Sequence, residues 1–323
     1  MLWPKRDTLG NDIKIFSGNA NKPLALKIAE CLGTTLSDAT VSHFSDGEIS
    51  IDINETVRGC DVFVIQPTCP PVNDNLMELM LMMDAFKRAS AGRVFAVIPY
   101  YGYARQDRKA KPREPIAAKL VADILTVSGA SGLLTMDLHA KQIQGFFDIP
   151  VDHVPGISVF TEHYLERSFD GSDLVVVSPD LGSVSRARSF SKKLNASLAI
   201  IDKRRPKPNQ CEVMNIIGEV RDKRVLVVDD LIDTAGTFIH AAEALMDAGA
   251  TEVYGCATHG VLSGDAVERI AASPIKELII TDTIPLPEHK QHEKIRILSV
   301  APIMAKAIVS ICEALPMSRL VDL

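Results

Sequence analysis

Residues 225–237 read VLVVDDLIDTAGT, and this stretch decides the fold of the chain. Its first four residues are valine or leucine, which favours a strand buried on both faces of a parallel sheet. Asp229 and Asp230 follow that run, and ligands of open α/β sheets bind outside the carboxyl ends of the strands. Because side chains alternate along a strand, we expect one acid to face a crevice and the other to brace the loop.

The turn after these acids consists of Asp233, Thr234, Ala235, Gly236 and Thr237. Its small residues let backbone N–H groups approach a phosphate closely, and its threonine hydroxyls can donate hydrogen bonds. A helix that we expect to start near Phe238 directs the positive end of its dipole at the same point. The acid in the crevice can accept hydrogen bonds from vicinal ribose hydroxyls or hold a hydrated cation. The stretch therefore predicts a ribose-phosphate site.

The same residues allow other interpretations. An acidic strand end before an N-capped helix is a common arrangement, since Thr and Asp are preferred caps. Receiver domains and aspartyl-phosphate phosphatases also place acids at the end of a strand. Neither class predicts the small, hydroxyl-rich turn in the same loop, so the ribose-phosphate interpretation is favoured.

The composition narrows the class of protein. A chain of 323 residues is long enough for two domains of typical size. No apolar run approaches the roughly 20 residues that span a bilayer, and residues 1–10 lack the apolar core of a signal peptide. We therefore expect a cytoplasmic protein that does not bind membranes. The net charge of −6 argues against a nucleic-acid binder, and six cysteines without a CxxC pair predict neither a disulfide framework nor a zinc site.

Apolar, β-rich runs recur along the chain with helical stretches between them, which predicts parallel sheets covered by helices. These runs are residues 62–65, 94–98, 174–177, 198–201, 225–228 and 278–280. Two segments look like copies of one strand–loop–helix–strand unit, one starting at residue 61 with its helix at 76–89 and one starting at residue 224 with its helix ending at 247. The first copy has Pro70 and Pro71 in the loop, where the second has its phosphate turn. Proline lacks an amide donor, so we expect only the second copy to hold ribose phosphate.

The Pro- and Gly-containing segment at residues 150–156 predicts a domain boundary, with domains at residues 1–155 and 156–323. A Met-rich helix at residues 76–83 carries apolar residues on more than one face, which is typical of core or subunit-interface packing.

The stretch 225–237 resembles the phosphoribosyl-pyrophosphate loop of type I phosphoribosyltransferases. Five further motifs resemble those of ribose-phosphate diphosphokinases, the phosphoribosyl pyrophosphate synthetases, in the same order: FSDGE (44–48), YARQD (103–107), DLHA (137–140), SPD (178–180) and IDKRRP (201–206). The chain looks like the phosphate-dependent bacterial type. This resemblance implies an α/β fold of two duplicated phosphoribosyltransferase-like domains, each a mainly parallel sheet flanked by helices. It also implies that the final helix packs on the first domain.

The chain has no GxxxxGK[ST] sequence, so ATP cannot be bound by a P-loop. Residues 100–115 hold five basic residues against two acidic ones, which fits either a lid over polyphosphate or a solvated loop. The resemblance assigns ATP binding to Arg105 and Gln106, and to Asp46, Gly47 and Glu48. In the family, the loop that contains the last three comes from a neighbouring subunit and reads the adenine ring.

His139 and Asp180 each follow a predicted strand. A lone histidine is more often structural than a ligand, but the resemblance makes both residues magnesium-associated. Mg²⁺ prefers carboxylate, water and phosphate oxygens, so Asp180 is the better direct ligand. His139 then acts through water or on a nucleotide phosphate, and Asp137 is a possible second contact.

Lys203 and Arg205 follow the apolar run 198–201, and alternation places them on one side of the chain. Two cations aimed at one spot suit a transferring diphosphoryl group, although a solvated basic hairpin turn fits the same residues. The resemblance matches both residues to the catalytic pair of the family, and Arg205 also to ribose 5-phosphate binding together with Asp229 and the turn 233–237.

By resemblance, the C1 hydroxyl of ribose 5-phosphate attacks the β-phosphorus of ATP, and AMP leaves. The resemblance further implies Mg²⁺, a homohexamer, activation by inorganic phosphate and inhibition by ADP. A nucleobase phosphoribosyltransferase and a non-catalytic synthetase-associated subunit are the alternatives. Two positions depart from the family pattern: Ser183 stands where a second glycine is usual, and Gly260 replaces a common proline. We expect neither to touch a catalytic position, and Ser183 to narrow the site near Asp180.

Overall fold

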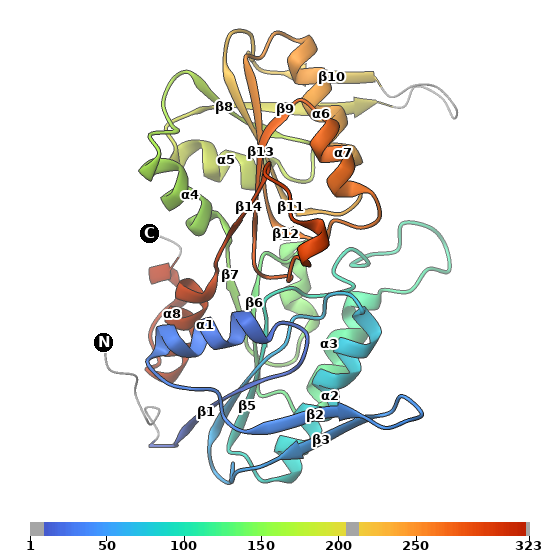
Figure 1. Cartoon of the computed structure of the whole chain (residues 1–323), viewed down its shortest axis with the longest axis vertical. Coiled ribbons are helices and arrows are strands. Elements are labelled where there is room, and N and C mark those ends of the chain that lie inside the picture. Colours follow the sequence, from blue (N-terminus) through green and yellow to red (C-terminus); the bar gives the residue numbers. More distant parts are fainter. Residues whose placement is uncertain (1–9, 205–212, 321–323) are drawn as a thin grey trace. The chain divides into compact units, whose positions relative to one another are not determined.

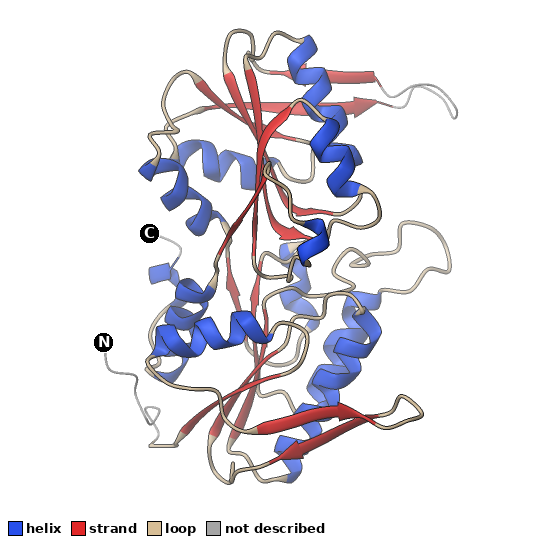
Figure 2. Cartoon of the chain, in the orientation of Figure 1, coloured by secondary structure: helices blue, strands red, loops and turns tan. Residues whose placement is uncertain are grey.

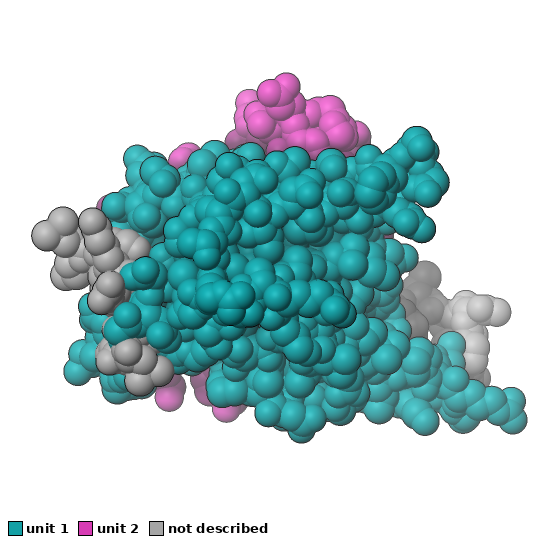
Figure 3. All heavy atoms as spheres, turned by 90° about the horizontal axis from the view of Figure 1, so that it is seen from below, with its two compact units in different colours: residues 1–155, 283–285, 299–323 teal, residues 156–282, 286–298 magenta. Residues whose placement is uncertain are grey.

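The structure is a computed structural model that describes residues 10–204 and 213–320. The chain divides into two compact units, which Figure 3 colours separately. Unit 1 comprises the chain up to residue 155, residues 283–285 and the chain from residue 299 onward; unit 2 comprises residues 156–282 and 286–298. Each unit is a sheet flanked by helices (Figure 2).

Unit 1 is built on a parallel sheet. Its strands, in sheet order, are β1 (Ile13–Ser17), β4 (Asp61–Ile65), β5 (Arg93–Ile98), β6 (Gly132–Met136) and β7 (Val151–Val154). Every side chain of β4 is buried, as expected for an apolar strand in the middle of a parallel sheet. A separate antiparallel hairpin joins β2 (Ala39–His43) to β3 (Ile49–Ile53).

Helices cover both faces of this sheet (Figure 1). They are α1 (Lys22–Leu32), α2 (Val72–Arg88), α3 (Ala117–Ser128) and α8 (Ala301–Cys312), with short 3-10 helices η1 (Lys141–Phe146) and η3 (Met317–Leu320). The final helix α8 packs beside α1 within unit 1. Helix α2 buries Leu79, Met82 and Met83 in the core, whereas Met77 is 48% exposed. Its Met-rich sequence thus serves core packing on one face, and the interface role of the other face stays a prediction.

Unit 2 is built on a larger sheet. Its strands, in sheet order, are β10 (Val213–Ile217), β9 (Ser197–Arg204), β8 (Leu174–Ser178), β11 (Arg224–Ile232), β12 (Glu252–Gly260), β13 (Ile275–Thr281) and β14 (Ile295–Leu298). All neighbours are parallel except β10, which is antiparallel to β9. Two apolar clusters lie on opposite faces of the sheet, one beneath α4 (Ile157–Glu166) and α5 (Val184–Lys193) and the other beneath α6 (Gly236–Asp247) and α7 (Ala266–Ala272). A 3-10 helix, η2 (Glu288–Lys290), precedes β14.

The predicted fold class is confirmed, because both units are mainly parallel sheets flanked by helices. All six predicted apolar runs lie in strands, and the two predicted copies appear as β4–α2–β5 and β11–α6–β12. Some limits differ. Helix α2 begins at Val72 rather than at residue 76, because Pro71 can cap a helix but cannot continue one. Residues 151–154 of the predicted boundary segment form strand β7.

Strand β11 is also longer than predicted, because it continues to Ile232 instead of ending at residue 228. Beyond Val227 it has no backbone pairing to β8, but it still pairs with β12 up to Ile232↔Gly260. An added Cβ at Gly260 would lie 2.5 Å from Ile280 Cδ1, so a larger residue there needs the Ile280 side chain to shift. Asp229 and Asp230 therefore lie in a part of β11 that is not paired with β8.

Candidate active site

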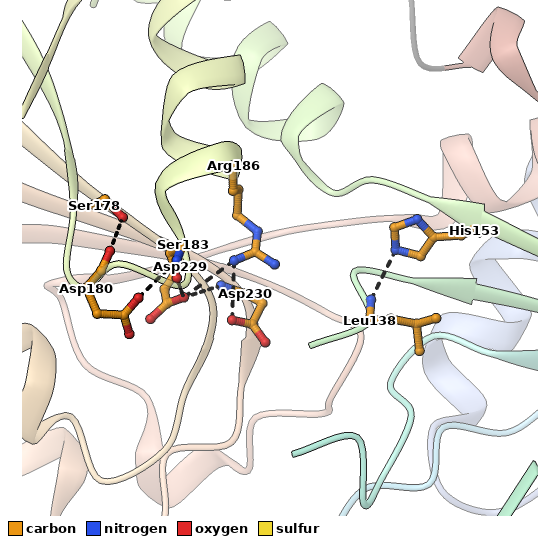
Figure 4. Close-up of polar contacts among 8 residues, drawn as sticks. All are labelled: Leu138, His153, Ser178, Asp180, Ser183, Arg186, Asp229 and Asp230. Carbon is orange, nitrogen blue, oxygen red and sulfur yellow. Dashed lines mark hydrogen bonds and ion pairs between the residues drawn. The ribbon is translucent and has the colours of Figure 1, made fainter. Parts of the chain in front are cut away.

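The neighbouring strands β8 and β11 bring two predicted site residues together. They are parallel and paired up to Val177↔Val227, so the residues that follow on each strand meet at the same edge of the sheet. After β8 the chain turns, with Ser178 Oγ donating a 2.7 Å hydrogen bond to the backbone oxygen of Asp180. The carboxylate of Asp180 thereby lies close to that of Asp229 (Figure 4).

Ser183 links these two acids. Its backbone N–H donates to Asp180 Oδ1 over 2.9 Å, and its hydroxyl donates to Asp229 Oδ1 over 2.7 Å (Figure 4). Ser183 was expected to narrow the site near Asp180, and its backbone contacts that residue. The expectation that it touches neither catalytic residue, Lys203 or Arg205, stays a prediction. Its contact with Asp229 arises because the pairing of β8 with β11 brings the start of α5 to the side chains of β11.

Asp229 and Asp230 share one cation. Arg186 Nη1 lies 3.5 Å from Asp229 Oδ1 and 3.3 Å from Asp230 Oδ1. The backbone N–H of Asp230 also donates to Asp229 Oδ1 over 2.9 Å. Alternation along the strand predicted carboxylates that point different ways, but both carboxylates lie within reach of the same Arg186 guanidinium. Asp230, 3% exposed, fits the bracing role that the sequence predicts.

Burial, together with the neighbouring Asp230 carboxylate, raises the pKa of Asp229 to about 7. Burial is the largest cause, and the neighbouring Asp230 carboxylate adds to it. The Ser183 hydroxyl and the Arg186 guanidinium act in the opposite direction, because both stabilise the ionised form. A ligand that donates hydrogen bonds to the Asp229 carboxylate would stabilise its ionised form.

The phosphate-type turn lies immediately after β11. Ala235 has a φ of 62°, in the left-handed region, and α6 starts directly after it at Gly236. A left-handed residue at this point turns successive N–H groups toward one side, which creates an anion-binding nest. The turn is fastened from outside by two hydrogen bonds: Arg269 Nη1 donates to the Thr234 oxygen over 2.9 Å, and Ser263 N–H donates to the Asp233 oxygen over 3.1 Å.

The corresponding loop of the first copy is occupied by protein contacts. Thr68 Oγ1 donates to the Tyr100 backbone oxygen and accepts a 2.6 Å hydrogen bond from Gly102 N–H. A Cβ on Gly102 would lie 2.4 Å from the Thr68 oxygen, so the two backbones are in close contact. With Pro71 as the residue before α2, this loop has neither the space nor the amides of a phosphate nest.

The predicted catalytic pair is only partly described. Lys203 lies in β9, with its backbone in register with Met214 of β10. Arg205 lies outside the described residues, so its predicted roles in catalysis and in ribose 5-phosphate binding stay predictions.

In unit 1, His139 lies just beyond strand β6 and is exposed. The backbone before it is held by His153 of the adjacent strand β7, whose Nε2 accepts a 3.1 Å hydrogen bond from Leu138 N–H (Figure 4). A histidine nitrogen that accepts is unprotonated, so neutral His153 fixes the start of the His139 segment. Asp137, the other candidate, is buried with a φ of 39°.

The predicted ATP residues lie on two loops of unit 1. Asp46, Gly47 and Glu48 form the exposed β2–β3 turn, where Asp46 Oδ1 accepts a 3.1 Å hydrogen bond from Glu48 N–H. Arg105 and Gln106 are exposed in the long connection between β5 and α3. Figure 1 shows the tip of the β2–β3 hairpin and the β5–α3 connection at separate places in unit 1.

The structure thus gathers Asp180, Asp229 and the turn 233–237 in unit 2 and adds residues that the sequence interpretation missed. These are Arg186 and Arg269, whereas Ser183 was already expected near Asp180. Ser183 and Arg186 are three residues apart at the start of a helix, a spacing that places them on one face and was a usable signal. Arg269 lies on α7, and no sequence pattern connects it to the turn.

Known proteins resemble this chain over most of its length. The chain matches the family model of the N-terminal domain of ribose phosphate pyrophosphokinase over residues 13–129 and the phosphoribosyl synthetase-associated domain over residues 203–322. It is 64% identical over 310 residues to the ribose-phosphate pyrophosphokinase of Caldanaerobacter subterraneus subsp. tengcongensis, covering 96% of this chain and 98% of that one. The corresponding protein of Clostridium perfringens is 62% identical over 310 residues, covering 96% and 97%.

The crystal structure of phosphoribosylpyrophosphate synthetase from Mycobacterium smegmatis superposes with a TM-score of 0.87 at 41% identity, covering 93% of this chain and 98% of that one. The two mainly parallel sheets flanked by helices and these family matches together define an α/β enzyme. The chain belongs to the ribose-phosphate pyrophosphokinase family, which confirms the resemblance seen in its motifs. No helix in the described part of the chain is long and apolar enough to cross a membrane.

Proposed function

We propose that this enzyme transfers the β,γ-diphosphoryl group of ATP to the C1 hydroxyl of ribose 5-phosphate, giving AMP and 5-phosphoribosyl 1-diphosphate. The observation that carries the proposal is the arrangement on β11, where Asp229 and the turn 233–237 follow one another beyond the part of the strand that is paired with β8. Family membership over nearly the whole chain favours this reaction over a nucleobase phosphoribosyltransferase.

Ribose 5-phosphate binds in unit 2 in this proposal. The amides of the turn 233–237 hold the 5-phosphate at the start of α6, where the helix dipole favours an anion. The carboxylate of Asp229 accepts hydrogen bonds from the vicinal ribose hydroxyls. Both anchors lie on one strand and the turn that follows it, so they set the orientation of the sugar rigidly.

Mg²⁺ fits the donors of this site. Asp180 supplies a carboxylate oxygen, and Mg²⁺ keeps several waters while binding only one or two carboxylates plus substrate phosphates. Asp180 uses Oδ1 to accept from Ser183 N–H, and its carboxylate is the proposed ligand, with His139 acting on water or on a nucleotide phosphate. When bound, the ion supplies charge neutralisation to the polyphosphate.

Lys203 and Arg205 are proposed to neutralise the charge that develops on the transferring group. No side chain has to form a covalent intermediate, because the attacking atom belongs to ribose 5-phosphate. Catalysis then rests on positioning and on fixed positive charge. Arg105 and Gln106 contact ATP, and Asp46, Gly47 and Glu48 read adenine from a neighbouring subunit. The separation of these two loops within one chain supports that arrangement.

Three finer features belong to the same proposal. We infer a homohexamer, activation by inorganic phosphate and inhibition by ADP, because the chain carries the motifs of the phosphate-dependent bacterial type. We place the reaction in the cytoplasm, where ATP is available as a substrate.

A ³¹P NMR assay tests the reaction directly. Purified protein is incubated with ATP, Mg²⁺, inorganic phosphate and ribose 5-phosphate. We expect AMP and a new C1 diphosphate signal, both dependent on ribose 5-phosphate. Lys203→Ala should lower kcat by about a hundredfold or more, as loss of a transition-state charge contact does. Lys192→Ala, an exposed lysine on α5, is the charge-matched control. No turnover by the unmodified protein would favour the non-catalytic subunit, and an unchanged kcat for Lys203→Ala would remove that residue from the catalytic pair.

A further inference from the structure

Ser183 is a buried residue that contacts both acids of the unit 2 site. It is 6% exposed, directly before the first turn of α5. Its N–H donates to Asp180 Oδ1 and its hydroxyl donates to Asp229 Oδ1, at 2.9 and 2.7 Å. Charge-assisted hydrogen bonds of this length are stronger than neutral ones. A single residue therefore holds two carboxylates, one from the loop after β8 and one from β11.

The hydroxyl of Ser183 does not act as a helix cap. Serine before a helix usually accepts a hydrogen bond from an N–H of the first turn, but no such bond is formed at α5. The Ser183 hydroxyl is instead turned toward β11. Its removal should leave the start of α5 intact, because the backbone there, with a φ of −89°, suits alanine as well.

The three donors around Asp229 all reach the same oxygen. Ser183 Oγ, the backbone N–H of Asp230 and Arg186 Nη1 contact Oδ1 at 2.7, 2.9 and 3.5 Å. Within residues 10–204 and 213–320, no hydrogen bond to Asp229 Oδ2 is formed. A carboxylate held by one oxygen has a fixed rotation, so the direction of Oδ2 is set before any ligand arrives.

We propose that Ser183 is a positioning residue for ribose 5-phosphate, which fixes the rotation of the Asp229 carboxylate so that Oδ2 receives the vicinal ribose hydroxyls. The inference rests on the proposed role of Asp229 in ribose binding. A side chain that is oriented in advance loses less conformational entropy when the ligand binds, so the affinity for the ligand is higher. Ser183 makes no contact with the transferring diphosphoryl group in this scheme, so its effect falls on ribose 5-phosphate binding.

The test is a steady-state comparison of Ser183→Ala with Ser185→Ala. Ser185 is exposed on the same helix and forms no side-chain contact with Asp229, so it is a matched control. We expect Ser183→Ala to raise the KM for ribose 5-phosphate about tenfold, which corresponds to about 1.4 kcal/mol. The KM for ATP and kcat should stay within about twofold, and the melting midpoint within a few degrees.

A double-mutant cycle separates positioning from a general structural effect. If Ser183 acts through Asp229, Ser183→Ala adds nothing to the KM once Asp229 is alanine, because the carboxylate that it orients is gone. Additive effects of the two changes would overturn the proposal. An unchanged KM in Ser183→Ala, or a fall in kcat alone, would also overturn it. These outcomes presuppose an active parent enzyme, so absence of AMP formation by the parent would count against the proposed function instead.

Discussion

Arg269 Nη1 donates a hydrogen bond of 2.9 Å to the backbone oxygen of Thr234, and so ties helix α7 to the phosphate-type turn. The guanidinium also lies close to Gly236, whose added Cβ would be 3.5 Å from Arg269 Nη2. The turn is therefore shaped from one side by its own backbone and from the other by a side chain 35 residues further along the chain. This brace has a direct consequence for substrate binding.

Replacing Arg269 with alanine should weaken ribose 5-phosphate binding. The Thr234 carbonyl loses its donor and the turn loses a fixed edge, so we expect the KM for ribose 5-phosphate to rise about fivefold to tenfold, the range of one lost charge-assisted hydrogen bond. Arg221→Ala is the control, because Arg221 is exposed at the opposite end of β11. Initial rates at varied ribose 5-phosphate measure both. Equal KM values for the two variants would show that the brace has no role in binding.

The raised pKa of Asp229, about 7, predicts a pH-dependent KM. Below that pH the carboxyl group is protonated and cannot accept both ribose hydroxyls, so the KM for ribose 5-phosphate should fall as pH rises from 6 to 8. In Asp229→Asn the side chain does not titrate, and this part of the pH dependence should disappear. Titration of the substrate phosphate remains in both enzymes and serves as the internal reference. Parallel pH profiles for the two proteins would contradict the assignment.

The same shift has a consequence for stability. A folded-state pKa above the usual value of 3.8 means that folding favours the neutral acid. That contribution is present below pH 3.8 and is lost as pH rises through about 7. Asp229→Asn should therefore raise the melting midpoint relative to the parent more at pH 8 than at pH 5. Differential scanning calorimetry without ligands at both pH values checks the sign, and a larger gain at pH 5 would contradict it.

Ala235 is held at a φ of 62° and is 3% exposed. A β-branched side chain is a strong outlier in this region of backbone space, so Ala235→Val should lower the free energy of unfolding by about 2 kcal/mol or more. It should also raise the KM for ribose 5-phosphate, because the nest cannot form. Ala235→Gly tolerates the conformation and should keep both properties close to those of the parent. Thermal melts and initial rates of the two variants test this prediction. Equal stability and equal KM in both variants would exclude backbone strain as the cause.

Asp61 offers a stability prediction remote from the site. It is fully buried at the start of β4 and forms an ion pair with Arg93, its partner in register on β5. Asp61→Ala leaves the guanidinium without its acceptor and should lower the free energy of unfolding by about 2 kcal/mol. Asp52→Ala, an exposed acid on β3, is the control. Urea unfolding measures the loss. A kcat that falls with stability unchanged would mean that the pair serves catalysis.

Much of the fold follows from local sequence. The apolar runs of β4, β8 and β11 are strands because continuous β-branched residues suit only a sheet that is covered on both faces. The ends of the helices and strands could be predicted less well from the sequence. Strand β11 runs four residues beyond its apolar run because its pairing with β12 continues, and pairing is a property of two strands.

The candidate site divides in the same way. The acids Asp229 and Asp230, the turn 233–237 and the family could all be predicted from the sequence. Each rests on short motifs of residues that are adjacent in the chain. Only the tertiary structure decided that Ser183 and Arg186 contact Asp229 and that Arg269 braces the turn. The physical reason is that these contacts join different strands and helices, whose proximity arises from sheet pairing and from packing of helices on the sheet. The direction of Asp229 Oδ2 is likewise set by donors from α5 and β11, and no local pattern contains that information.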